Sequence, residues 1–70
     1  MTRVNVRFFM GNYAINMPFL LEEGTSLEDA TGLIVKKIKT HDYLYNHGGD
    51  ITEVIACKHI QYFEIQIEHS

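Results

Sequence analysis

The sequence predicts a small α+β domain in which one amphipathic helix packs across a small sheet of antiparallel or mixed strands. Three observations predict this fold class. Residues 1–10 and 60–68 alternate between apolar and polar side chains, the period of a half-buried strand. Residues 25–39 carry apolar side chains at the spacing of one helix face. The pair Gly11-Asn12 separates two strand-like segments in the manner of a hairpin turn.

Seventy residues are expected to form one domain, 1–70. A chain of this size buries only about 60% of its unfolded surface, so burial and conformational entropy nearly cancel. Cys57 is the sole cysteine, which leaves no partner for an internal disulfide. We therefore expect a homodimer as the additional source of stability.

Residues 3–20 are predicted to form a β-hairpin, with its second strand over residues 13–21. Pro18 lies within that second strand and lacks the N–H group that a hydrogen-bonded ladder needs. The second strand is therefore expected to lie at the edge of the sheet, or to end at Pro18.

The helix begins after a capping signal and fades near Thr40. Either Thr25 with Glu28 or Ser26 with Asp29 offers a capping box, in which side chains satisfy free backbone N–H groups of the first turn. Acidic residues in the first turn and lysines in the last complement the helix dipole. The face predicted to meet the sheet carries Leu27, Ala30, Ile34 and Ile38, flanked by Leu33 and Val35.

Residues 41–50 are predicted to be a connection, with Gly48-Gly49 as its firmest turn signal. Residues 51–58 fit two structures. Asp50 and Glu53 offer the cap of a short helix, whereas the Ile, Thr and Val content favours a strand. The element order is therefore ββαββ, or ββααβ if residues 51–57 are helical.

We expect no catalytic residue, no metal and no cofactor. Structural zinc needs close pairs of Cys and His ligands, and no cysteine pair accompanies the histidines. Cys57 beside a histidine resembles a nucleophile and base, but so small a domain has little room for a concave site. A buried, inert thiol is the favoured interpretation. The histidines, interpreted as surface or loop residues, are His41, His47, His59 and His69.

Two groups of residues are candidates for binding a partner. Tyr43 and Tyr45 are aromatic residues with polar tips, which are frequent anchors at protein interfaces, unless they close the end of the core. The outward positions of the last strand carry Glu64 and Glu68 and no basic residue. The alternative is that Arg3 and Arg7 neutralise these carboxylates across neighbouring strands.

A small domain with an acidic face on a sheet-plus-helix body, and no set of catalytic residues, resembles the host-takeover proteins of lytic bacteriophages. Within that group it is similar to inhibitors of the bacterial nucleoid protein HU, which act as dimers that mimic DNA. The resemblance implies a non-enzymatic inhibitor whose carboxylates stand in for phosphates and block the DNA-binding surface of an HU-like host protein. The implied residues are Glu64, Glu68, Glu22, Glu23 and the neighbouring acids Glu28, Asp29 and Asp42.

The alternative function is a protein–protein interaction module that uses residues 41–50, with Tyr43 and Tyr45 at its centre. The formal net charge of −3 disfavours direct binding of nucleic acid or of an anionic membrane. It also means that DNA mimicry requires acids gathered on one face. No apolar run approaches the roughly 18 residues of a membrane span, and no signal peptide is recognised. The expected location is the cytoplasm, that of the host cell for a phage-encoded protein.

The expected homodimer is testable by sedimentation equilibrium. We predict a dimer at high micromolar concentration, formed through an edge strand or through the Gly32 side of the helix. A folded monomer of 8.1 kDa under the same conditions would contradict the prediction.

Overall fold

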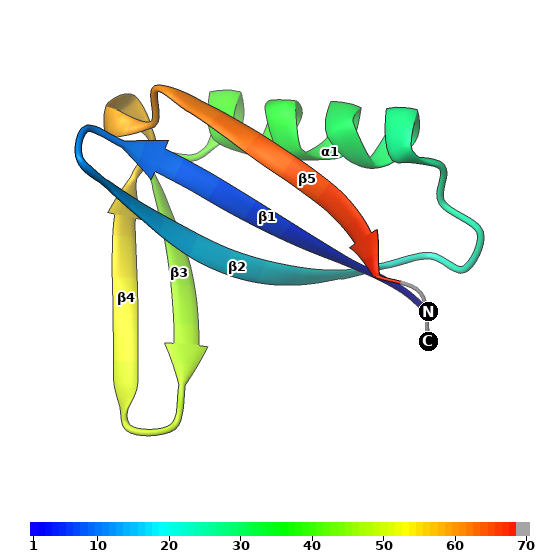
Figure 1. The fold of residues 1–70 in the computed structure, drawn as a ribbon, viewed down its shortest axis with the longest axis horizontal. Helices are drawn as coiled ribbons and strands as arrows, with labels where there is room; N and C mark the ends of the chain where they lie inside the picture. The colour runs from blue at the N-terminus through cyan, green and yellow to red at the C-terminus, as the bar shows by residue number, and fades with distance from the viewer. Residues whose placement is uncertain (69–70) are drawn as a thin grey trace.

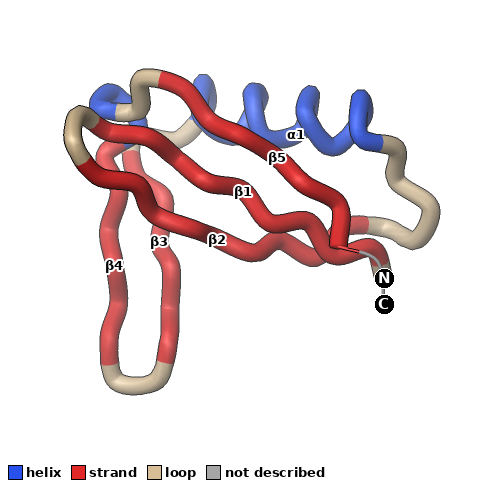
Figure 2. The backbone as a smooth tube through the Cα atoms, in the orientation of Figure 1, coloured by secondary structure: helices blue, strands red, loops and turns tan. Residues whose placement is uncertain are grey.

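The computed structural model describes residues 1–68, in which five strands, one α-helix and one short 3-10 helix are found (Figure 2). In chain order these elements are β1 (Thr2–Met10), β2 (Tyr13–Leu21), α1 (Leu27–Thr40), β3 (Tyr43–Gly48), β4 (Ile51–Ala56), η1 (Cys57–His59) and β5 (Tyr62–Glu68).

The described chain forms two antiparallel sheets. One has the strand order β2-β1-β5, and α1 runs along it as a second layer (Figure 1). The other is the hairpin β3–β4, which extends away from this layered body (Figure 1). The predicted α+β class is confirmed. The predicted order ββαββ lacks one strand, since the observed order is ββαβββ.

β1 is the centre of the core because strands flank it on both sides and its inner face is fully covered. Val4, Val6 and Phe8 have no exposed surface. Val6 pairs with Met17 on β2 and with Ile65 on β5. The alternation predicted for residues 1–10 thus produces one buried face, and the inward side chains of both neighbouring strands extend it.

β2 is an edge strand, as Pro18 predicts, but it continues past the proline to Leu21. Pro18 lies opposite Asn5 in the register with β1. In a hairpin with a two-residue turn, the pair flanking the turn is hydrogen-bonded and the pairs then alternate. Counting from Met10 opposite Tyr13, Pro18 falls on a pair without hydrogen bonds, so its missing N–H costs the ladder nothing.

α1 has the predicted cap and a narrower buried stripe than predicted. Asp29 N–H donates to the Ser26 hydroxyl at 3.1 Å, which selects the Ser26 cap of the two alternatives. Ala30 and Ile34 are buried. Leu27, predicted to face the core, is 49% exposed, so the buried stripe begins at Ala30.

Residues 41–50 are not the connection that the sequence predicts, since most of them form β3. The strand alternative for residues 51–58 is confirmed by β4. Gly49, with φ of +61°, occupies the two-residue turn between these strands, where glycine adopts a positive φ without strain. The apolar pattern does not reveal β3, because Leu44, paired with Ile55, is the sole buried residue of this strand.

Replacing Ile34 by alanine tests the buried face of α1. Ile34 is 1% exposed, so Ile34→Ala is expected to lower the free energy of unfolding by about 2–5 kcal/mol in a denaturant titration. Leu33→Ala is the matched control, because Leu33 is 49% exposed and loses little burial. A loss below about 0.5 kcal/mol for Ile34→Ala would mean that this face is misassigned.

Candidate protein-binding surfaces

The residues singled out by the sequence lie in three separate places. The first is the end of the molecule where α1 begins, the second is the exposed face of β5, and the third is the β3–β4 hairpin. They hold, in that order, Glu22, Glu23, Glu28 and Asp29; Glu64 and Glu68; and Asp42, Tyr43 and Tyr45.

The carboxylates of β5 face arginines. β1 and β5 are neighbours, and their register sets Arg3 opposite Glu68 and Arg7 opposite Glu64. Arg3 Nε lies 3.1 Å from Glu68 Oε2, and Arg7 Nε donates to Asn16 Oδ1 at 3.0 Å. Two arginines and two glutamates leave this part of the sheet with no net formal charge. The condition for cross-strand neutralisation, raised from the sequence, is therefore met.

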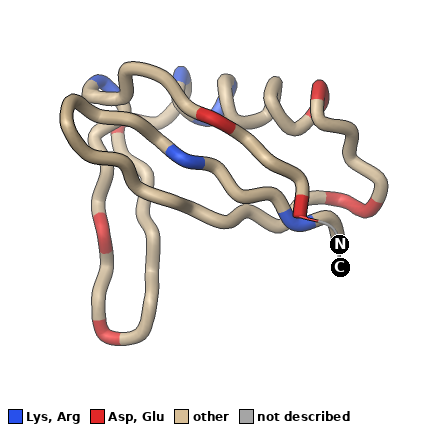
Figure 3. Tube along the Cα trace, in the orientation of Figure 1, with Lys and Arg blue, Asp and Glu red and all other residues tan. Residues whose placement is uncertain are grey.

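We name the residues Glu22, Glu23, Glu28 and Asp29 the acidic end (Figure 3). Glu22, Glu28 and Asp29 line one shallow hollow, which Lys36 also borders. No lysine or arginine occurs between Arg7 and Lys36 in the sequence.

The Met1 amino group lies 2.7 Å from Glu23 Oε2. The hydrogen bond from this amine, and its charge, lower the pKa of the Glu23 carboxyl. Within residues 1–68 no cation stands at ion-pair distance from the other three carboxylates of the acidic end.

The β3–β4 hairpin carries only negative charge. Residues 40–57 contain Asp42, Asp50 and Glu53 and no lysine or arginine. Their formal charge of −3 equals that of the whole chain. Asn46 Nδ2 donates to Glu53 Oε1 at 3.0 Å, and Glu53 is exposed. The acids of the hairpin are therefore not cancelled by a basic residue of the same segment.

The side of the hairpin turned away from the core is apolar and exposed. The register sets Tyr43 opposite Ala56 and Tyr45 opposite Val54, so these four side chains share one face, the outer hairpin face. Tyr43, Tyr45 and Val54 are 51%, 58% and 55% exposed. Tyr43 and Tyr45 do not close the core, and this sequence alternative is wrong. The inner face of the hairpin packs Leu44 and Ile55 into the core, so its outer face is the one left exposed.

Two of the histidines make contacts with residues close to them in the chain. His47 Nδ1 lies 3.0 Å from Thr52 Oγ1, and His41 Nδ1 lies 3.0 Å from the Lys37 carbonyl oxygen. Within residues 1–68 no group of three His, Cys, Asp or Glu side chains is arranged to hold a metal ion. His69 lies outside the described residues.

Cys57 is buried where η1 begins, and its N–H donates to the Asp42 carbonyl at 2.9 Å. Burial, with the Asp42 carboxylate as a smaller cause, raises the pKa of the Cys57 thiol. A raised pKa depletes the thiolate, which is the nucleophilic form.

Comparison of the chain with protein-family models, with curated proteins and with solved structures gave no match. In the part of the chain that the structure describes, no helix has the length and apolar character needed to cross a membrane.

The burial of the Cys57 thiol can be tested by measuring its rate of alkylation. We predict that the folded protein reacts with iodoacetamide at pH 8 several-fold more slowly than the urea-unfolded chain, because the thiol is buried and its pKa is raised. The rate of the folded protein is expected to keep rising with pH after that of the unfolded chain has levelled. Equal rates for the two forms at pH 8 would show that Cys57 is open to solvent.

Proposed function

We propose that the protein is a non-enzymatic inhibitor of the phage type, which binds a basic DNA-binding protein of a bacterial host, such as HU, and blocks its binding to DNA. The observation that carries the proposal is the segregation of charge. Four acids lie in the acidic end and three in the hairpin, which is seven of the nine in the chain. Neither segment contains a lysine or arginine, so both present carboxylates that a basic surface attracts.

In this function the acids of the hairpin contribute more to binding than Glu64 and Glu68, which the sequence analysis had put first. Glu64 and Glu68 stand opposite arginines, so they contribute little net field. Asp50 and Glu53 belong to the part of the hairpin that extends away from the body, where they can reach into a basic, concave DNA-binding surface (Figure 3). At an ionic strength of about 0.15 M the Debye length is about 8 Å, so carboxylates that approach the partner closely dominate the attraction.

The outer hairpin face supports a second candidate function, a general protein–protein interaction module. Tyr43, Tyr45 and Val54 form an exposed apolar surface beside the hairpin acids. Aromatic side chains ringed by polar groups are typical of the centre of protein interfaces. Under this function the tyrosines dominate the affinity and the partner needs no basic surface.

A gel-shift competition with purified HU tests the first proposal. We predict that the wild-type protein displaces DNA from HU at low salt and does so less well as salt rises. Asp50→Asn with Glu53→Gln should weaken the competition by roughly threefold to tenfold, because each carboxylate at a solvated interface contributes up to about 1 kcal/mol.

The matched control removes the same two charges from β5. Glu64→Gln with Glu68→Gln should leave competition nearly unchanged, since both carboxylates face arginines. If the wild-type protein fails to displace DNA at low salt, the inhibitor function is wrong. If Tyr43→Ser with Tyr45→Ser abolishes competition while the acid variants do not affect it, the interaction module describes the protein better.

A further inference from the structure

An apolar groove lies between α1 and the edge strand β2. It has a volume of about 300 Å³, at the lower limit of sites that bind small molecules. The groove exists because α1 runs nearer to β5 than to β2, which leaves the inner side of β2 partly uncovered (Figure 1). Phe19 and Leu21 of β2 form one wall, and Leu33 and Ile34 of α1 form the other.

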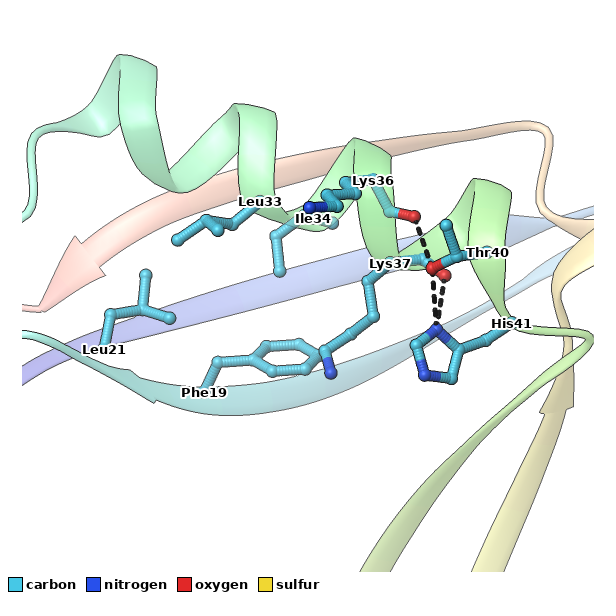
Figure 4. A pocket seen from close by; sticks show the side chains of 8 residues that line it. All are labelled: Phe19, Leu21, Leu33, Ile34, Lys36, Lys37, Thr40 and His41. Carbon is cyan, nitrogen blue, oxygen red and sulfur yellow. Dashed lines mark hydrogen bonds between the residues drawn. The ribbon is translucent and has the colours of Figure 1, made fainter.

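The groove is polarised along its length. Leu21 and Leu33 lie together at one end, whereas Lys37, Thr40 and His41 lie toward the other (Figure 4). Lys36 also lines the groove, and no acidic residue does so in the described part of the chain. From Leu33 to His41 the helix advances about 12 Å at 1.5 Å per residue. An apolar chain that ends in an anion matches this distribution of side chains.

Two backbone carbonyl groups at this end of α1 already accept hydrogen bonds within the chain. Thr40 Oγ1 donates to the Lys36 carbonyl oxygen at 2.8 Å, and His41 N–H donates to the Lys37 carbonyl oxygen at 3.1 Å. These terminal carbonyl groups are therefore occupied. Within residues 1–68 no carboxylate lies at ion-pair distance from Lys36 or Lys37, which leaves both ammonium groups available to a ligand.

We propose that this groove binds a medium-chain fatty carboxylate. Its alkyl chain lies against Phe19, Leu33 and Ile34, and its carboxylate lies near Lys37, toward the end of the groove that His41 lines (Figure 4). The half-buried Lys37 stem extends from α1 toward Phe19, so its ammonium group stands beside the apolar wall (Figure 4). This site is separate from the hairpin, and it adjoins the hollow of the acidic end, with which it shares Leu21, Leu33 and Lys36. It does not depend on the inhibitor function.

Titration of the ¹⁵N-labelled protein with octanoate, below its micellar concentration, tests the proposal. The expected result is a saturable shift of the Phe19, Leu33 and Lys37 amide signals. Affinity should rise by up to about fourfold for each methylene from hexanoate to octanoate, as expected for chain burial. Octylammonium has the same chain and the opposite charge, so it should bind more weakly. Equal binding of octylammonium and octanoate, or shifts confined to other elements, would overturn the proposal.

Two matched pairs of variants locate the site. Lys37→Gln should weaken octanoate binding about twofold to fivefold, the range expected for an ion pair at a solvated rim. Lys39→Gln removes the same charge from the same helix but lines a different hollow, so it should have no effect.

Leu33→Gln should abolish the saturable shift. Leu20→Gln, at a comparably exposed leucine outside the groove, should leave it intact. Circular dichroism checks that each variant is folded. Equal effects of the two variants in either pair would contradict a carboxylate site in this groove.

Discussion

The fold depends on the complete burial of one face of β1. Val4, Val6 and Phe8 are covered by the inward side chains of β2 and β5 and by the layer of α1, and each of those elements is placed by that contact. Phe8 and Phe63 pack with ring centroids 6.0 Å apart, which ties β5 to the same centre. At roughly 1.5–3 kcal/mol for each buried large apolar side chain, this one strand accounts for a large share of the core of so small a domain.

The sequence predicts the elements that bury a continuous face and fails for the element that does not. β1 and α1 follow from periodicity because their apolar residues recur toward one side. β3 escapes because its aromatic residues, Tyr43 and Tyr45, face solvent and its buried contact is limited to Leu44. The hairpin turn predicts that β1 pairs with β2, but the pairing of β5 with β1 could not be predicted, because alternation identifies the buried side of a strand and not its neighbour.

The candidate binding surfaces follow from the sequence only where their residues are close together in the chain. The sequence predicts that Arg3 and Arg7 face Glu68 and Glu64 only on the condition that β1 and β5 are neighbours, and the register of the two strands meets that condition. The gathering of Glu22, Glu28 and Asp29 around one hollow follows from the loop and the first turn of α1, so their sequence proximity already indicates it. The projection of Asp50 and Glu53 away from the body depends on β3, the strand that the apolar pattern does not reveal.

The pairing of β1 with β5 has a consequence for synthesis of the chain. Val6 meets Met17 across 11 residues but Ile65 across 59, and closing the longer loop costs roughly 1.5 kcal/mol more in chain entropy. On a ribosome the first hairpin and α1 emerge well before β5, so one edge of β1 stays open until the last strand is made. During that interval the nascent chain presents an unpaired strand beside its apolar face, the kind of surface that chaperones recognise and that neighbouring nascent chains can capture.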